Sequence, residues 1–257
     1  MKIAASDYDG TLFRNDTIAA ADAQGVHRWR EAGHLFGVVT GRDYGMLAPQ
    51  LRHYGIESDY AVCNNGGLIC KADGTPLWQG KIPLRTLAEM VREPGVRRSF
   101  HFAFSAADKT YLYHEREGSW ISREAKQWDF TIVLITEQDI MSLPQIHQFS
   151  LGYPDPSESA EVSEILNARY GDVIHAYPNR CSLDITPKGI SKEQGIRKLI
   201  ELMGWSSPEI YTIGDEINDL PMIEAFGGFT VDTARDAIKA KARGVYAGVG
   251  AMLEANI

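Results

Sequence analysis

The sequence predicts an α/β protein: a doubly wound, mostly parallel, Rossmann-like core sheet with an inserted α+β cap domain. In residues 1–80 and again after residue 185, short apolar strands alternate with helices, which is typical of parallel β–α units. Between residues 81 and 184 strands outnumber helices, which favours an antiparallel sheet. We therefore expect a core domain of residues 1–80 and 185–257, interrupted by a cap domain of residues 81–184.

The first part of the chain is expected to form three strands and two helices. Ala23, Val26 and Trp29 recur near helical spacing before Gly33, which indicates a helix that ends there. Pro49 is expected to interrupt or kink the second helix, because proline lacks the backbone donor that a helix interior needs. The expected strands cover 2–6, 35–40 and 60–63, and the expected helices 22–32 and 43–54.

The inserted region is expected to contain six strands and one long helix. Two strands are joined by a turn around Ala107 and Asp108, and the amphipathic helix is closed by Gly171. The strands are expected at 99–104, 110–114, 131–136, 146–153, 173–177 and 182–186, and the helix at 159–170.

After the insert the strand–helix alternation resumes. Ser191 is a plausible N-cap for a helix that ends at Gly204, because a serine hydroxyl accepts from free amides at a helix start. The expected helices cover 191–203, 218–225 and 234–242, and the expected strands 209–213, 228–231 and 244–246.

Composition excludes several classes of protein. The chain has 257 residues, of which 44% are hydrophobic and 23% charged, as in ordinary globular proteins. A net charge of −8 argues against nucleic-acid and anionic-membrane partners, since both are polyanions. Three cysteines imply no disulfide framework, and Asp7 and Asp9 stand where a signal peptide needs an apolar run. We expect a cytoplasmic protein, a monomer or small homo-oligomer.

Acidic side chains follow two of the expected strands. Asp7 and Asp9 come after the first strand, two residues apart, so that an extended chain points both the same way. Asp215 and Asp219 follow the strand at 209–213. The carboxyl ends of parallel strands line one crevice, and carboxylates that converge there stay ionised only with a cation. Oxygen ligands of this kind suit Mg²⁺, although each aspartate could instead merely cap a helix or turn.

Groups that bind anions accompany these carboxylates. Lys192 opens the helix after the insert and can reach a phosphate or pair with a nucleophilic carboxylate. Thr40 and Gly41 end a strand and offer a hydroxyl and a close backbone approach. Carboxylates, a cation, a lysine and a hydroxyl together make a phosphoryl-transfer site.

Four ordered motifs resemble those of the haloacid dehalogenase superfamily, in its Cof-like branch with a type IIB cap. DYDGTL at 7–12 is similar to the first motif, VVTGR at 38–42 to the second, GISKEQGI at 189–196 to the third and IGDEINDLPMI at 213–223 to the fourth. NNGG at 64–67 is similar to the loop that precedes the cap in this branch. The resemblance covers essentially the whole chain.

This resemblance implies a role for each matching residue. Asp7 would be the nucleophile that forms an aspartyl-phosphate, and Asp9 would protonate the leaving oxygen and then activate water. Thr40 and Lys192 would hold the phosphoryl oxygens. The Mg²⁺ ligands would be Asp7, the backbone carbonyl of Asp9 and Asp215, with Asp219 in support. The substrate-binding residues would be Thr11, Gly41, Arg42, Asn64, Asn65, Gly66 and Asn218.

Some residues keep two interpretations. Asn64 and Asn65 contact a ligand or only form a turn, and Arg42 lies near substrate or makes a structural pair. Arg180 leans over the site from the cap or lies in an exposed turn. Glu216 stands where the family commonly has glycine, and would add charge near the metal or simply be tolerated.

The resemblance favours a Mg²⁺-dependent phosphatase for a small phosphorylated metabolite, a sugar phosphate or a similar organic phosphate ester. One alternative is a phosphosugar mutase on the same scaffold, which would return the phosphoryl group to the sugar. Another is a non-catalytic phosphometabolite sensor or phospho-aspartate receiver. Asp9 discriminates against this last class, because a sensor needs no acid for a leaving group.

Overall fold

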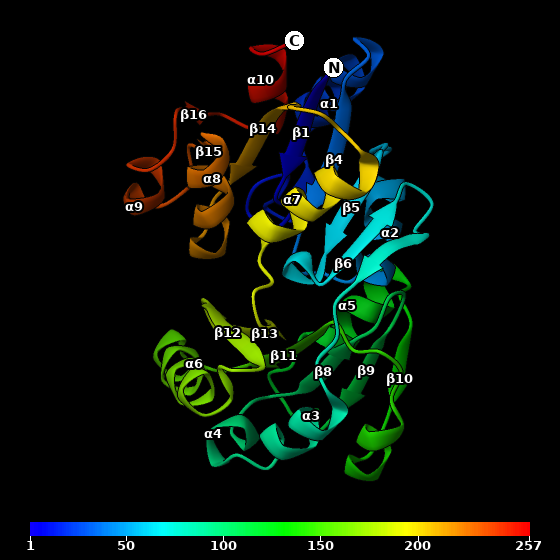
Figure 1. The fold of residues 1–257 in the computed structure, drawn as a ribbon, viewed down its shortest axis with the longest axis vertical. Helices are drawn as coiled ribbons and strands as arrows, with labels where there is room; N and C mark the ends of the chain where they lie inside the picture. The colour runs from blue at the N-terminus through cyan, green and yellow to red at the C-terminus, as the bar shows by residue number, and fades with distance from the viewer.

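A computed structural model describes residues 1–257, and the chain forms two large β-sheets, one above the other in Figure 1. The larger sheet is built from the two ends of the sequence. Its strands are β1 (Lys2–Ser6), β4 (Leu35–Val39), β5 (Tyr60–Cys63), β6 (Leu68–Lys71), β7 (Pro76–Gln79), β14 (Glu209–Gly214), β15 (Phe229–Val231) and β16 (Val245–Tyr246).

The order of this sheet places the start of the chain at its centre. The spatial order is β16-β15-β14-β1-β4-β5-β6-β7, and β1 pairs in parallel with both β14 and β4. The pairs from β16 to β5 are all parallel, whereas β6 pairs antiparallel with both β5 and β7, so that β6 alone runs against the other strands. The expected mostly parallel α/β sheet is therefore confirmed, whereas the β6–β7 hairpin was not predicted.

Helices cover both faces of this sheet. On one face Trp29, Leu47 and Leu253 belong to the largest buried apolar cluster, and on the other Ile196 and Met222 pack against the strands. These helices are α1 (Ala20–Glu31), α2 (Tyr44–His53), α7 (Lys192–Met203), α8 (Leu220–Phe226), α9 (Asp236–Lys239) and α10 (Val249–Glu254). No helix of the structure is both long and apolar enough to cross a membrane.

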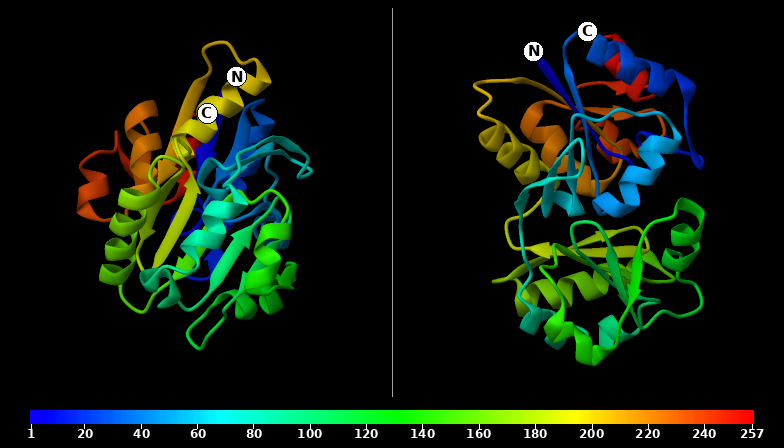
Figure 2. Two further views of the ribbon diagram at one scale, coloured as in Figure 1. Left: turned by 60° about the horizontal axis from the view of Figure 1, so that its bottom comes forward. Right: turned by 90° about the vertical axis from the view of Figure 1, so that its right-hand side faces the viewer.

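Residues 81–184, here called the cap segment, contribute most of the second sheet (Figure 2), and its strand β13 continues three residues beyond the segment, to Pro187. Its strands are β8 (Phe102–Ser105), β9 (Thr110–Tyr113), β10 (Ile132–Leu134), β11 (Gln148–Gly152), β12 (Ile174–Asn179) and β13 (Ser182–Pro187). Its helices are α3 (Leu84–Met90), α4 (Pro94–Arg97), α5 (Ile121–Trp128) and α6 (Pro156–Tyr170). The spatial order is β10-β9-β8-β11-β13-β12. Most pairs are antiparallel, but β10 pairs in parallel with β9, because α5 lies between them and returns the chain in the same direction.

The two faces of the cap sheet differ in chemistry, as side chains alternate along each strand. Phe104, Phe149 and Leu151 point to one face and belong to the buried apolar cluster of the cap segment. The neighbouring positions on the other face are small or polar, among them Ser150 and Asp184, which lie opposite each other in the β11–β13 register. This polar face is the one that contacts the larger sheet's strand ends.

Several local expectations were wrong. Helix α2 is not interrupted at Pro49: the Asp43 side chain caps it, and Met46 and Leu51 bury its inner face. The expected helix at 234–242 shrinks to the four residues of α9. A 3₁₀ turn, η3 (Ile217–Asp219), stands where the expected helix at 218–225 would begin, and α8 starts only afterwards. A further 3₁₀ turn, η2 (Glu137–Ser142), and a small hairpin of β2 (Phe13–Arg14) and β3 (Thr17–Ile18) were not predicted.

Candidate active site

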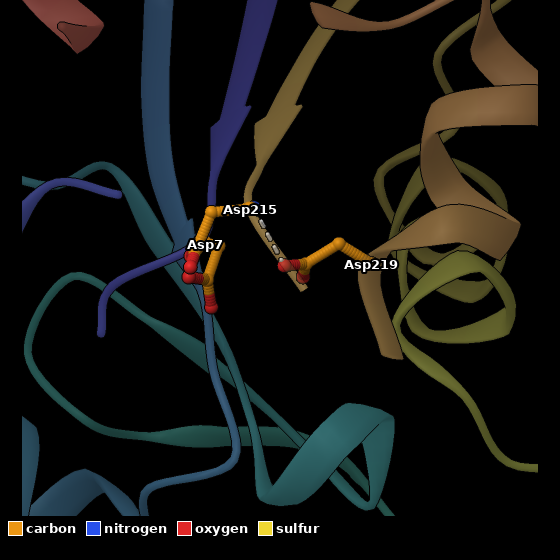
Figure 3. A group of neighbouring side chains, drawn as sticks. All are labelled: Asp7, Asp215 and Asp219. Atoms are coloured by element: carbon orange, nitrogen blue, oxygen red, sulfur yellow. Dashed lines mark hydrogen bonds between the residues drawn. The ribbon is translucent and has the colours of Figure 1, made fainter. Parts of the chain in front are cut away.

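Asp7 and Asp215 lie side by side where the two central strands end. The β1–β14 register pairs Ser6 with Ile213, and the Asp7 amide donates to the Ile213 carbonyl at 2.9 Å. Figure 3 shows both carboxylates at these strand ends, with Asp219 pointing toward them from the start of α8. One carboxylate oxygen from each of the three residues lies within 4.8 Å of the others.

The turn after β14 fixes the position of Asp219. Its Oδ2 accepts hydrogen bonds from the amides of Asp215 and Glu216, each at 3.0 Å, and this closes the η3 turn. Its Oδ1 accepts from Lys192 Nζ at 2.5 Å. Asp219 therefore joins the strand end that carries Asp215 to the first residue of α7.

Lys192 is a buried ammonium group between two carboxylates. Ser191 caps α7, its hydroxyl accepting from the Gln194 amide, so that Lys192 is the first residue of the helix. Its Nζ donates to Asp7 Oδ1 at 2.6 Å and to Asp219 Oδ1. Although burial opposes the charge, the attraction of Asp219 and Asp7 raises the pKa of Lys192 above its ordinary value.

The charges of the cluster do not balance without a further cation. Burial and the repulsion of Asp219 raise the pKa of Asp7 well above its ordinary value, and the same two causes raise that of Asp215. Three carboxylates face the buried ammonium of Lys192 and, 3.3 Å from Asp215, the largely exposed guanidinium of Arg180, so negative charges outnumber positive ones. A hard divalent cation with oxygen ligands fits this donor set.

Gly10 and Thr11 hold Asp215 in place. Gly10 has a φ of 90°, and a Cβ there would collide with the Asp215 carboxylate. Thr11 Oγ1 donates to Asp215 Oδ1 at 2.8 Å. Thr11, which we expected to bind substrate, is thus engaged with a carboxylate of the cluster.

The carboxylate of Asp9 lies apart from this cluster and is held by Arg42. The regular strand ends at Ser6, and Tyr8 lies in a turn between the two aspartates. Arg42 Nε and Nη2 donate to the two oxygens of Asp9, each at 2.8 Å, in a two-pronged ion pair. Arg42 Nη1 also donates to Glu124 on α5 at 3.1 Å. Arg42 therefore connects Asp9 to the cap segment.

Thr40 and Gly41 lie at the end of β4, next to the cap segment. Thr40 is fully buried, and its Oγ1 accepts from the Arg42 amide at 3.1 Å. The Gly41 carbonyl accepts from Gln148 Nε2 at 2.8 Å. The backbone at 40–41 is thereby fixed from both sides.

The loop at 64–67 contains two asparagines in the left-handed region, with φ of 53° for Asn64 and 51° for Asn65. Asn65 Nδ2 donates to Gln148 Oε1 at 2.9 Å and to Asp184 Oδ2 at 3.1 Å, and its Oδ1 accepts from Asn218 Nδ2 at 3.3 Å. Asn64 is fully buried, yet neither polar atom of its side chain has a protein partner. Such atoms normally find a partner, so Asn64 is available to a ligand. Gly66, with a φ of 102°, passes close to the Ser191 carbonyl.

Comparison with known proteins places this arrangement in a family. A sequence model of the haloacid dehalogenase-like hydrolases matches residues 4–248. The chain belongs to this family. It is thus a hydrolase by family, as its four motifs led us to expect.

Three similar proteins illustrate this hydrolase family. The chain is 25% identical to the pyridoxal phosphate phosphatase YbhA of Escherichia coli, covering 94% of this chain and 91% of that protein. It is 24% identical to the HMP-PP phosphatase of Yersinia pestis, covering 93% and 86%. The solved structure of a subclass IIB sugar phosphatase superposes with a TM-score of 0.76 at 21% identity, covering 99% of this chain and 97% of that one. The fold of the hydrolase is therefore shared along its whole length.

The sequence of this hydrolase did not reveal the polar residues that the cap segment brings to the site. Glu124 meets Arg42, and Gln148 and Asp184 meet Asn65. Ser150 Oγ donates to Asp184 Oδ1 at 2.7 Å, and burial raises the pKa of Asp184. Alternation along the expected strands could have assigned Ser150 and Asp184 to one face, but no motif indicates which face meets the core.

Proposed function

We propose that the chain hydrolyses a phosphate monoester of a small organic metabolite, a sugar phosphate or similar compound, through a phosphoryl group carried by Asp7. The observation that carries this proposal is the buried ion-paired cluster of Asp7, Lys192 and Asp219 beside Asp215 at the strand ends. A carboxylate held next to an ammonium group can attack phosphorus while the cation neutralises the charge of the phosphoryl oxygens.

The proposed reaction has two steps. In the first, an Asp7 oxygen bonds to phosphorus, the bond between phosphorus and the leaving oxygen breaks, and Asp9 donates a proton to that oxygen. In the second, Asp9 takes a proton from water, the water oxygen bonds to phosphorus, and the acyl phosphate bond to Asp7 breaks. Arg42 holds both oxygens of Asp9, and each oxygen keeps a second lone pair for the proton that these steps transfer.

Other residues are proposed to bind the phosphoryl group and the metal. Lys192 and Thr40 would hold phosphoryl oxygens, and the unpartnered side chain of Asn64 would accept or donate a further hydrogen bond. Asp7, Asp215 and the Asp9 carbonyl would hold Mg²⁺, with Asp219 fixing the loop. When bound, Mg²⁺ would supply positive charge against the phosphoryl oxygens and restore the charge balance of the cluster. The remaining substrate contacts are assigned to Gly41, Arg42, Asn65, Gly66 and Asn218.

We propose that residues 81–184 act as a cap domain over a core of residues 1–80 and 185–257. The apolar clusters of the two sheets have no buried member in common. Side chains of the cap segment reach the strand ends at Arg42, Asn65 and Asp215. A cap in this position would exclude water and select substrates while the core supplies phosphoryl transfer.

The test is a hydrolysis screen of the purified chain with Mg²⁺. Sugar phosphates, pyridoxal phosphate, nucleotides and other cofactor phosphates would be compared by the release of inorganic phosphate. The two curated relatives are named for phosphorylated heterocycles and the solved structure for sugar phosphates, so both groups belong in the screen. Hydrolysis should require Asp7. Release of phosphate at the wild-type rate by Asp7→Asn would contradict the proposed function.

A further inference from the structure

Arg180 lies at the tip of the β12–β13 hairpin, in a backbone conformation unusual for arginine. The register pairs Asn179 with Ser182, so the turn consists of only two residues, Arg180 and Cys181. Arg180 has a φ of 53°, in the left-handed region that favours glycine and asparagine. Its carbonyl accepts from Ser159 Oγ on α6 at 2.7 Å. The two-residue turn and this hydrogen bond fix the backbone from which the Arg180 side chain extends.

The Arg180 side chain crosses from the cap segment to the carboxylate cluster. Its Nε donates to Glu216 Oε2 at 2.8 Å, and its Nη2 donates to Asp215 Oδ2 at 3.3 Å. The hydrogen bond to Glu216 raises the pKa of Arg180, and the charges of Asp215 and Asp7 act in the same direction. The side chain is 60% exposed, and neither contact uses Nη1. Nη1 is thus left without a protein partner, next to the Nη2 atom that contacts Asp215.

Glu216 is placed to anchor this arginine. Its side chain is 8% exposed, and Oε1 accepts from the Ile217 amide at 3.3 Å. Oε2 faces Arg180 from the cap segment and, at 3.4 Å, Arg235 Nη2 from the core. A carboxylate buried to this extent needs a cationic partner. The residue that departs from the family's usual glycine therefore has a partner on the opposite side of the site.

We propose that Arg180 is a substrate-binding residue of the cap, positioned by Glu216, that binds the anionic oxygens of the phosphate ester beside Asp7. This inference rests on the proposed phosphatase function. Arginine binds phosphate through two parallel hydrogen bonds, which Nη1 and Nη2 would form once Nη2 is released from Asp215. The side chain reaches the site only when the cap segment lies against the core, which couples closure to phosphate binding.

The two carboxylates that Arg180 contacts, Asp215 and Glu216, are proposed to have different roles. Asp215 is a candidate metal ligand, and a cation held there would repel the guanidinium, which would leave Nη2 free. Glu216 lies outside the three-carboxylate cluster and keeps its bond to Nε. Arg180 therefore stays beside the site while its Nη atoms become available to phosphate.

The experiment is calorimetric titration of the whole protein with inorganic phosphate in the presence of Mg²⁺. Arg180→Ala should weaken phosphate binding about tenfold, as expected for loss of a charge-assisted contact. Arg180→Lys should recover part of the affinity, because lysine supplies the charge without the planar fork. Arg235→Ala, which removes the other partner of Glu216, is the matched control and should bind phosphate like the wild type.

Two further variants separate positioning from simple electrostatics. The variant Glu216→Gln removes a negative charge near the site. If only the charge of residue 216 matters, this variant should bind phosphate more tightly than the wild type. If Glu216 holds Arg180 in place, as proposed, the variant should bind phosphate several-fold more weakly. The double variant Arg180→Ala/Glu216→Gln should bind as weakly as Arg180→Ala, because Glu216 acts through Arg180. Wild-type affinity in Arg180→Ala, or restored affinity in the double variant, would overturn the inference. A wild-type protein that neither binds phosphate nor hydrolyses any ester would instead overturn the proposed function.

Discussion

Two groups of polar residues meet at the strand ends, and they are built differently. The first group, here called the floor, consists of Asp7, Lys192, Asp215 and Asp219, which are buried where β1 and β14 end and α7 begins. The cap contacts connect a residue of the cap segment with a residue outside it. These pairs are Thr110–Asp43, Glu124–Arg42, Gln148–Gly41, Asp184–Asn65 and Arg180–Glu216.

The difference concerns what each interaction can contribute. Lys192 and Asp7 are enclosed by protein, so their mutual attraction is strong and removal of one partner leaves an unpaired buried charge. In the Arg180–Glu216 pair the arginine is largely exposed, so water screens the contact and it can break and re-form. The floor is thus suited to chemistry that needs a fixed geometry, and the Arg180–Glu216 contact to binding and release. The Thr110–Asp43 and Asp184–Asn65 contacts are buried and hold the cap segment more firmly.

The largest effect is expected on the floor. Asp7→Asn should lower kcat by about 10⁴-fold or more, because an amide is a poor nucleophile toward phosphorus. The measurement is steady-state phosphate release with the best substrate of the screen. Asp22→Asn is the matched control: Asp22 is also buried and ion-paired, with Arg14 at 3.1 Å, but belongs to α1. It should lose stability and keep its kcat, and a comparable loss of kcat in both variants would contradict a special role for Asp7.

Removal of the metal should have the next largest effect. Chelation with EDTA should abolish activity and added Mg²⁺ should restore it, because the cluster carries uncompensated negative charge. Asp215→Ala should raise the Mg²⁺ concentration needed for half-maximal activity by about tenfold or more. The metal-free variant should also melt at a higher temperature than the metal-free wild type, since one of the repelling carboxylates is gone. Asp232→Ala, an exposed site, provides the control, and full activity in EDTA would refute the metal assignment.

Asp9 stands between the two regions, since Arg42 joins it to the cap contact at Glu124. Asp9→Asn should reduce kcat by about 10²–10⁴-fold through the loss of acid–base catalysis. The phosphorylated form of Asp7 should then accumulate, because the water that cleaves it has lost its base. Rapid quenching followed by intact-protein mass spectrometry would detect the added phosphoryl group. A variant that keeps wild-type kcat would exclude Asp9 as the acid.

The floor could be predicted from the sequence because its residues follow apolar strands directly. Asp7 comes one residue after β1, and Asp215 one residue after β14, so recognising the strands was enough to bring both together. Lys192 follows from a helix start marked by Ser191. The cap contacts could not be predicted, because they depend on how two separately packed sheets are oriented. Glu124 and Arg42 are distant in sequence, and no local pattern specifies their meeting.

Sequence patterns also failed to predict some elements of secondary structure correctly, because these elements depend on tertiary packing. The hairpin of β6 and β7 consists of short strands at the edge of the sheet, where local apolar alternation is weak. Helix α9 is shorter than its pattern suggested, because the apolar residues at 234–242 pack beside β15 without completing regular turns. Tertiary packing decides such boundaries, and local propensity alone does not.

A pH experiment tests one core residue that meets the cap segment. Thr110 Oγ1 donates to Asp43 Oδ2 at 2.7 Å, and burial raises the pKa of Asp43 to about 6. Between these two pKa values Asp43 is protonated in the folded protein and ionised in the unfolded chain. The free energy of unfolding therefore falls as the pH rises from the ordinary pKa of 3.8 to about 6. Asp43→Asn should gain up to about 3 kcal/mol relative to the wild type between about pH 4 and pH 7. Denaturant unfolding across this range measures the difference, and a constant difference would contradict the shifted pKa.

The smallest effect is expected at the Glu124–Arg42 contact. The two side chains are only partly buried, with 24% of Glu124 exposed, and a pair of this kind contributes about 1 kcal/mol, or roughly a fivefold change in an equilibrium. If the contact holds the cap segment against the core, Glu124→Gln should raise KM by about fivefold with little change in kcat, because closure is weakened while the floor is intact. Glu115→Gln is the matched control, as Glu115 accepts only from Ser119 and Ser122 within the cap segment. It should change the melting temperature and leave KM unaltered. If Glu124→Gln instead lowered kcat as much as Asp9→Asn, Glu124 would take part in the reaction itself. The division into a floor and cap contacts would then be wrong.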